Sequence, residues 1–344
     1  MKKQIELLSP AGDFNCVKAA VQNGADAIYL GFSSFSARSS ATNFTLEELK
    51  QAIEYAHVRN VKIHLALNIL IKNNEFSEAI SIAEKAYEYG VDAIIVQDLG
   101  LALTLINHFP KLAIHASTQM TANDLNSVKS LERLGFKRVV LARELSLQEI
   151  ECICRNTEIE VETFAHGALC ISYSGQCLMS SMIGGRSANR GKCAQACRLP
   201  YQLLENDKVI DNGYLLSPRD LCAIEFIPGL IEAGVTSFKI EGRLKSPEYV
   251  AIVTRIYRKY IDLYLSGQNY EIDPKDIQDL RQAFNRGNFS TGHLSTKPNR
   301  DLVFKEKQNN MGIYIGNVAN YNEKKGHITL NLNERIAIRR LCDI

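Results

Sequence analysis

The chain contains no long hydrophobic run. No stretch approaches the roughly 20 consecutive apolar residues that a membrane-spanning helix needs. The opening residues, M-K-K-Q-I-E-L-L-S-P, are interrupted by Glu6 and Pro10 and lack the apolar core and small-residue cleavage site of a signal peptide. From these absences we expect a cytoplasmic protein with no membrane association.

The chain also lacks a strong charge of either sign. Its 40 Lys and Arg residues nearly balance 38 Asp and Glu residues, which leaves a formal net charge of +2. Overall composition therefore does not indicate a nucleic-acid partner. Hydrophobic residues make up 46% of the 344 positions, which argues against disorder and supports one large α/β domain with a small appendage.

Four segments repeat one pattern, in which a helix end is followed by a glycine and then by a short apolar strand. Glycine can take the left-handed conformation that ends a helix. The strands do not alternate with polar residues, as expected for a parallel sheet buried on both faces. The segments are 21–31, 87–97, 132–142 and 231–241. Internal repetition of this kind is a strong indication of fold.

Four more strands are predicted between these units, and helical patterns fill the gaps. The additional strands are 5–8, 62–68, 112–116 and 158–164. The helices are 13–23, 46–58, 76–89, 98–108, 122–134, 146–155, 219–233 and 247–265. Eight such units over residues 1–265 match the size of a (β/α)8 barrel, a TIM-like α/β fold. A doubly wound open sheet is the alternative, and the regular count of eight favours closure.

A barrel of this type carries its chemistry at the carboxyl ends of the strands and in the loops that follow them. Several polar residues occupy those positions, although any one of them could instead cap a helix. The expected substrate-binding residues are Asn68, Gln97, Gln119, Arg143, Lys239 and Arg243, and the expected catalytic residues are His115, His166, Glu162 and Glu241. The basic members suit a phosphate or a dicarboxylate. Either histidine could move protons, and a core position is an equal alternative for His115.

Five of the nine cysteines fall in one part of the chain, mostly within an excursion at 167–216 that follows the seventh strand. They are Cys170, Cys177, Cys193, Cys197 and Cys222. Disulfides are disfavoured in a reducing compartment. A zinc site would prefer two close pairs, whereas an iron–sulfur cluster tolerates irregular spacing. A thiol nucleophile beside His166 and plain buried cysteines remain alternatives.

Several motifs resemble the collagenase-like peptidase family U32. They are E-L-L-S-P-A-G, N-G-A-D-A-I-Y-L-G-F, H-A-S-T-Q-M, E-T-F-A-H-G-A-L-C-I-S-Y-S-G-Q-C-L-M-S (162–180), R-G-K-C-A-Q-A-C-R and K-I-E-G-R-L-K-S-P-E-Y-V. The resemblance covers residues 4–300, and the 162–180 signature is long and specific.

The resemblance implies two kinds of activity. Some members of the family are named as proteases, and some of those act on collagen. Others are oxygen-independent hydroxylases with a 4Fe–4S cluster that act on a tRNA wobble uridine, a ribosomal RNA cytidine or a ubiquinone precursor, with prephenate implicated in the RNA branches. Some work as pairs with a paralogous partner chain. By the same resemblance the cluster ligands are Cys170, Cys177, Cys193 and Cys222, with Cys197 as the alternate fourth ligand.

The residues favour the hydroxylase over the peptidase. A protease needs a nucleophile with its base, a metal-bound water or paired carboxylates. Neither G-x-S-x-G nor H-E-x-x-H occurs in the chain. Glu162 and Glu241 could form a carboxylate pair, but a cluster-dependent enzyme also explains the grouped cysteines. Because the resemblance implies RNA hydroxylases, we expect hydroxylation of RNA, at a tRNA uridine, with a small aromatic substrate and peptide hydrolysis as alternatives.

The chain changes character after residue 265. Residues 266–303 are predicted to form a loop-rich linker, and 304–344 a partial β module of two or three strands. So few strands are not independently stable. The strands are therefore expected to dock on the barrel or to be completed by a partner, unless the gene product is shortened.

Overall fold

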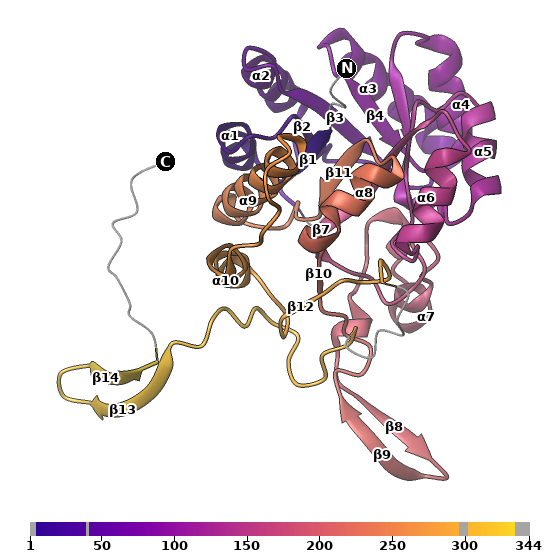
Figure 1. Cartoon of the computed structure of the whole chain (residues 1–344). Helices are drawn as coiled ribbons and strands as arrows, with labels where there is room; N and C mark the ends of the chain where they lie inside the picture. The colour runs from indigo at the N-terminus through magenta and orange to yellow at the C-terminus, as the bar shows by residue number, and fades with distance from the viewer. Residues whose placement is uncertain (1–4, 39–40, 296–301, 334–344) are drawn as a thin grey trace.

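The computed structural model describes residues 5–38, 41–295 and 302–333. Within these residues the main body is a closed barrel of eight parallel strands (Figure 1). The strands are β1 (Glu6–Ala11), β2 (Ala27–Gly31), β3 (Lys62–Leu67), β4 (Ala93–Val96), β5 (Ala113–Ala116), β6 (Arg138–Val140), β7 (Glu160–Ala168) and β11 (Ser237–Ile240). Pairing of β11 with both β1 and β7 closes the ring. The predicted (β/α)8 barrel is confirmed.

Helices surround the barrel at nearly the predicted positions. They are α1 (Phe14–Gln22), α2 (Leu46–His57), α3 (Phe76–Glu88), α4 (Leu99–His108), α5 (Leu125–Arg133), α6 (Leu147–Arg155), α8 (Ile227–Ala233) and α9 (Pro247–Leu265). The repeated glycines Gly24, Gly90, Gly135 and Gly234 all have positive φ, between 89° and 114°. Thr45 and Glu48 form a reciprocal capping box on α2, as their spacing predicts. The periodic units were therefore predictable because helix ends and starts carry local signals.

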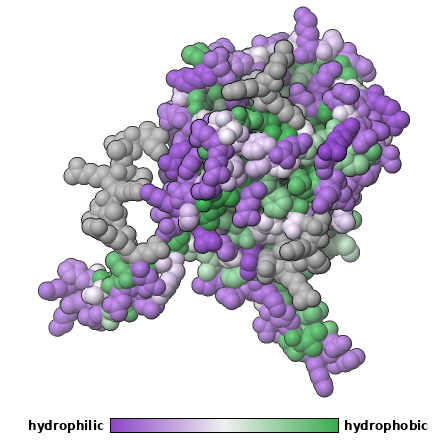
Figure 2. All heavy atoms as spheres, viewed as in Figure 1, coloured by the Kyte–Doolittle hydropathy of each residue, from purple (hydrophilic) through white to green (hydrophobic). Residues whose placement is uncertain are grey.

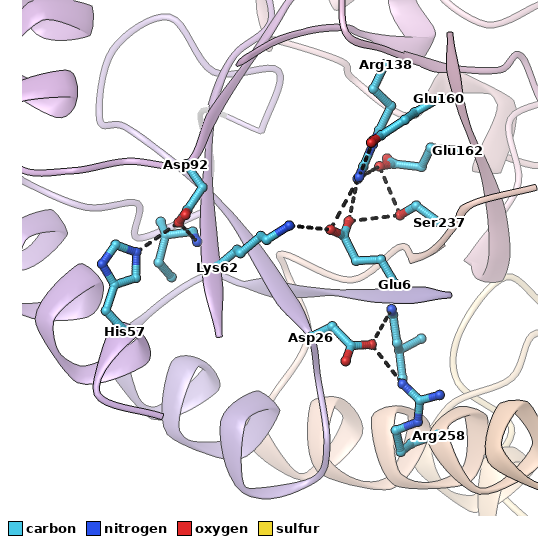
Figure 3. Close-up of polar contacts among 12 residues, drawn as sticks. Glu6, Asp26, His57, Lys62, Asp92, Arg138, Glu160, Glu162, Ser237 and Arg258 are labelled. Atoms are coloured by element: carbon cyan, nitrogen blue, oxygen red, sulfur yellow. Dashed lines mark hydrogen bonds and ion pairs between the residues drawn. The ribbon is translucent and has the colours of Figure 1, made fainter. Parts of the chain in front are cut away.

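The interior of the barrel holds an ion network in place of an aliphatic layer (Figure 3). Glu162 is fully buried and accepts hydrogen bonds from Lys239 Nζ at 2.8 Å and from Arg138 Nη1 at 3.1 Å. Arg138 also pairs with Glu6 and Glu160. Because every one of these charges has an opposite partner, the network can be buried without leaving a charge unpaired.

A long insertion follows β7. It contains α7 (Met179–Gly184), the hairpin β8 (Tyr201–Glu205) and β9 (Lys208–Gly213), and β10 (Asp220–Cys222). Strand β10 runs antiparallel to the end of β7, with Cys222 opposite His166. The predicted helix at 219–233 is therefore wrong in its first half: strand β10 and a 3-10 turn precede α8, which begins only at Ile227.

The segment expected to be a linker contains regular structure. Helix α10 (Pro274–Ala283) begins with the Asp273 cap and Pro274, and the short strand β12 (Phe289–Ser290) pairs with β10. These start signals were present in the sequence, but the surrounding turn residues suggested a loop. Further on, β13 (Gly316–Asn322) and β14 (His327–Leu332) form an antiparallel hairpin, and residues 334–344 lie outside the described part of the chain.

Both two-stranded hairpins project from the barrel, and Figure 2 shows apolar residues on each of them. In the described residues, neither hairpin pairs with a third strand. No described helix combines the length and apolar character needed to cross a bilayer.

Candidate functional site

A cavity of about 380 Å³ opens at the carboxyl ends of the barrel strands and is covered by the insertion. Asn68 follows β3, Ser117–Gln119 follow β5, Arg143 follows β6 and Glu241–Lys245 follow β11. The opposite wall comes from the insertion, from Ala168 to Arg198. The cavity therefore lies where a barrel of this type places its chemistry.

The charged residues of the described lining are basic, apart from the single carboxylate of Glu241. The basic members are Arg38, Arg143, Arg198, Lys239, Arg243, Lys245 and Arg286. Such an excess of cations in a partly enclosed space favours an anionic ligand. The lining also contains apolar surface, including Tyr29, Ile95 and Phe164.

Glu241 organises two of these cations. Its carboxylate oxygens lie 3.1 Å from Arg38 Nη2 and 3.1 Å from Arg143 Nη2. Burial raises the pKa of Glu241, but Arg38 and then Arg143 more than offset this, and the pKa falls to about 2. Arg143 also donates to the Ala168 carbonyl and lies over the Phe164 ring, 3.8 Å from its centroid. Glu241 is thus a fixed anion that orients arginines.

Arg243 is a buried cation without a carboxylate partner among the described residues. Its Nη1 donates to Ser36 Oγ at 2.6 Å. Burial lowers the pKa of its guanidinium to about 10, which reflects the cost of holding an uncompensated charge there. A Cβ added at Gly31 would lie 2.1 Å from Arg243 Nη1, so the glycine at the end of β2 makes room for this side chain.

Three cations of the lining, Arg38, Lys245 and Arg286, were not predicted from the sequence. Lys245 lines the cavity just after Arg243, and Arg286 reaches it from the loop before β12, where it pairs with Asp220 at 2.8 Å. The contiguous run G-R-L-K at 242–245 could have indicated Lys245. Arg38 and Arg286 carry no local signal, because their loops reach the cavity only through tertiary packing.

Neutral polar residues form part of the floor and wall. Gln119 Nε2 donates to the Asn68 carbonyl at 2.9 Å, and Asn68 Oδ1 accepts from the Ala37 amide at 3.1 Å. Both residues line the cavity, as predicted for strand-end positions. Gln97 is buried behind them, with its amide against the Gln119 backbone, and is not part of the described lining. It therefore supports the wall instead of facing a ligand.

The structure does not place the predicted histidines in the cavity. His115 packs edge-on against His64 inside the barrel, with ring centroids 5.0 Å apart, and burial holds its pKa well below the ordinary value. His166 Nδ1 lies 3.3 Å from the Tyr257 hydroxyl, and burial lowers its pKa to about 3. Both rings are therefore neutral core residues, which was the alternative considered for His115.

Glu162 also lies away from the predicted site. Its carboxylate is engaged by Arg138 and Lys239 inside the barrel, so it does not form a carboxylate pair with Glu241, the arrangement that a peptidase could have used. The reason is depth along the barrel axis: Glu162 pairs in register with Ser237 near the start of β11, whereas Glu241 follows the end of that strand. Lys239 connects the two regions, because it pairs with Glu162 and also lines the cavity floor.

Four of the five grouped cysteines line one wall of the cavity. They are Cys170, Cys177, Cys193 and Cys197. Burial raises the pKa of the Cys197 thiol, Arg198 lowers it, and the nearby Cys170, Cys193 and Cys177 raise it further. In the described part of the chain, no three His, Cys, Asp or Glu side chains converge closely enough to hold a single metal ion. The four thiols therefore line the same wall but do not converge on a single point.

Cys222, the expected fourth ligand, lies elsewhere. It is buried on β10, and its Sγ is 3.7 Å from the Tyr257 hydroxyl in the protein core. It does not line the cavity. The antiparallel pairing of β10 with β7 produces this result, and the helix predicted at 219–233 contains no such pairing.

Hydrogen bonds to the barrel loops hold the insertion over the cavity. Thr121 Oγ1 donates to the Ser174 carbonyl at 2.7 Å, and the Ser174 amide donates to Glu144 at 3.1 Å. At the far side, Arg190 pairs with Glu75 at 2.7 Å. Within the insertion, Arg198 Nη2 donates to the Leu169 carbonyl at 3.0 Å, which joins the end of the cysteine wall to the residue that follows β7.

Comparison with known proteins identifies the family. Residues 12–303 match the model of peptidase family U32, and the chain therefore belongs to that family. It is 40% identical over 340 residues to an uncharacterized protease of Methanocaldococcus jannaschii, covering 94% of this chain and 82% of the relative. It is 36% identical to tRNA hydroxylation protein P1 of Bacillus subtilis, covering 95% and 80% of the two chains. It is also 36% identical to the 23S rRNA 5-hydroxycytidine synthase of Escherichia coli, covering 97% of this chain and 51% of that enzyme.

Proposed function

We propose that this member of peptidase family U32 is an RNA hydroxylase that modifies a tRNA uridine without molecular oxygen and depends on a 4Fe–4S cluster. Two of its relatives are named for hydroxylation of tRNA and of ribosomal RNA. The observation that carries the proposal is the cavity itself, in which four thiols form one wall beside an excess of cations. That combination suits a redox group next to an anionic substrate.

The cysteines that would hold the cluster are Cys170, Cys177, Cys193 and Cys197. A cubane is bound through different irons, so its thiolates stand further apart than those around one ion. The gathered but non-converging thiols fit that requirement. When bound, the cluster would supply electron transfer or a Lewis acid at the cavity wall. Cys197 replaces Cys222 in this proposal, because Cys222 lies in the core.

The residues of the chain bind and orient the substrate. Arg243 and Lys245, which have no carboxylate partner in the described structure, would receive phosphate or carboxylate groups, including those of a dianion such as prephenate. Glu241 holds Arg38 and Arg143 in place, and the Tyr29 and Phe164 rings offer apolar surface for a base. Cytoplasmic location and a paralogous partner chain remain predictions from the sequence.

Two measurements test the proposal. Anaerobically purified protein should contain about four irons and four sulfides per chain, the composition of a cubane. Deletion of the gene should remove one hydroxylated uridine from digested tRNA, and the wild-type gene should restore it. Protein that stays free of iron after anaerobic reconstitution would contradict the cluster. An unchanged set of nucleosides in both tRNA and ribosomal RNA would contradict the RNA substrate.

Peptide hydrolysis is the second candidate, and it rests on the names of two relatives, the uncharacterized protease and a collagenase of Porphyromonas gingivalis. In the described residues, the cavity brings neither a histidine nor a second carboxylate to Glu241. If iron-free protein cleaves denatured collagen or casein, and the Glu241→Gln variant does not, the peptidase becomes the better assignment.

A further inference from the structure

Lys245 is a cavity lysine that the described carboxylates leave unpaired. No ion pair or hydrogen bond joins its Nζ to any described residue. The two carboxylates whose charges act on Lys245 are already engaged, since Glu241 binds Arg38 and Arg143, and Asp220 binds Arg286. Lys239, in the same cavity, differs because Glu162 holds its ammonium at 2.8 Å.

The surroundings of Lys245 are apolar and cationic. Its Nζ lies over the Phe284 ring and 5.7 Å from the centroid of the Tyr249 ring. Burial, followed by the positive charge of Arg286, lowers the pKa of Lys245 to about 7, while Asp220 and Glu241 oppose this shift. A lysine with these neighbours is partly neutral at physiological pH, and the neutral amine is a nucleophile.

A second cation that lines the same cavity can hold an anion. Arg243 lies two residues earlier, lines the same cavity and has no carboxylate partner among the described residues. Guanidinium groups bind carboxylates in a fixed, two-pronged geometry. The cavity therefore combines an anion holder with an amine of lowered proton affinity.

We infer that Lys245 captures the carbonyl group of a small oxo acid as an imine, while Arg243 holds the carboxylate of that acid. The amine nitrogen forms a bond to the carbonyl carbon, and the π electron pair of the carbonyl moves to its oxygen. That oxygen then takes up a proton, and the nitrogen loses one. The resulting carbinolamine then loses its oxygen as water to give the imine. No oxidant or reductant is needed for this step, since it is a reversible condensation.

This inference does not depend on the cluster or on RNA. Imine formation requires only the folded cavity and the oxo acid, and it can be measured on the purified chain. A failure of the hydroxylase proposal would therefore leave the trapping result unchanged, and a failure of trapping would leave the iron and nucleoside measurements unchanged.

Borohydride trapping tests the inference. Full-length protein is incubated with glyoxylate or pyruvate at pH 7.5, reduced with borohydride and digested for mass spectrometry. The Lys245 peptide should gain the mass of the oxo acid less one oxygen atom, because condensation removes water and reduction adds two hydrogens. Since an ordinary lysine is almost wholly protonated at this pH, Lys245 should be modified about a hundredfold faster than surface lysines.

Two controls make the result specific. Lys239 in the same cavity should stay unmodified because its ammonium is paired with Glu162. The Lys245→Arg variant, which keeps the charge, should lose the cavity adduct, whereas Lys305→Arg, at an exposed surface pair, should retain it. Modification spread evenly over surface lysines, or no adduct at Lys245 with either oxo acid, would overturn the inference.

A second measurement needs no variant. Reductive methylation of the wild-type protein with labelled formaldehyde, followed by NMR titration, gives the pKa of each dimethyl-lysine. One resonance should titrate near the value of about 7 expected for Lys245. If all lysine resonances titrate together near the ordinary value, the amine is not activated and the inference fails.

Discussion

The interior of the barrel and its mouth both contain buried charges, but only in the interior are those charges balanced. Inside, Glu6, Glu160 and Glu162 surround Arg138, and Glu6 also reaches Lys62 (Figure 3). Glu162 also binds Lys239. At the mouth, Glu241 alone faces a larger set of Arg and Lys side chains in the described lining. A balanced network contributes to a unique fold, whereas unbalanced cations cost stability unless a ligand neutralises them. The difference separates structural from functional charge in one molecule.

The largest effect is expected on iron binding, when a cysteine of the cavity wall at the barrel mouth is replaced. Cys197→Ala should abolish iron binding in the anaerobic assay, because it removes a thiol from the cavity wall. Cys222→Ala should keep its iron, because Cys222 is a core residue, and should lose only about 1 to 2 kcal/mol of unfolding free energy from its small cavity. Loss of iron in Cys222→Ala with retention in Cys197→Ala would reverse our ligand assignment.

The interior network should be the most sensitive to removal of its central carboxylate. Glu162→Ala leaves Arg138 and Lys239 buried with less compensation, so the free energy of unfolding should fall by about 3 to 5 kcal/mol. Chemical denaturation measures this directly. The control is Glu160→Gln, whose half-exposed side chain should contribute less than about 1 kcal/mol. Equal losses of unfolding free energy in the two variants would show that the buried Glu162 contributes no more to stability than the half-exposed Glu160.

The opposite behaviour is expected at the mouth. Arg243→Met removes a buried cation that has no described carboxylate partner, so its unfolding free energy should stay within about 1 kcal/mol of the wild type or rise. The proposed hydroxylation activity of this variant at low substrate should fall about thirtyfold, the equivalent of roughly 2 kcal/mol of lost anion binding. If the variant is destabilised but fully active, Arg243 stabilises the fold and does not bind the substrate.

Lowering the pH should reduce the unfolding free energy gradually, through protonation of the interior network, and by less than the substitutions above. Burial raises the pKa of the Glu6 carboxylate, but His64 and the paired Arg138 more than offset this, and the pKa falls from 4.5 to about 2. The unfolded chain therefore binds the proton first, so this stabilisation is complete above pH 4.5 and is lost as the pH falls toward 2. The slope attributable to Glu6 approaches about 1.4 kcal/mol per pH unit. Denaturation curves of Glu6→Gln between those pH values should be flatter by that amount, and curves parallel to the wild type would contradict the assignment.

Local signals explain why the barrel was predictable. Gly24, Gly90, Gly135 and Gly234 each end a helix in a left-handed conformation, and each precedes a strand buried on both faces. These features depend on a few neighbouring residues, so they appear in the sequence wherever the unit repeats. The grouping of cysteines in 167–222 is equally visible, and four of them do meet in one wall.

The depth of a side chain along the barrel axis was not predictable in the same way. Glu162 and Lys239 are close to strand ends in sequence, yet the register between β7 and β11 pairs Glu162 with Ser237 inside the barrel. His115 and His166 face the core for the same reason, because hydrogen-bond register between strands, not position along one strand, decides which residues reach the mouth.

The amino-acid sequence by itself determined the repeated units, the number of barrel strands and the concentration of thiols after the seventh strand. Only the tertiary structure decided which charges meet. It brought Arg38, Lys245 and Arg286 from three separate loops to one cavity, and it placed Cys222 in the core through the antiparallel pairing of β10. The physical reason is range: helix ends and buried strands are specified by neighbours along the chain, whereas charge balance depends on residues that are distant in sequence and adjacent only after folding.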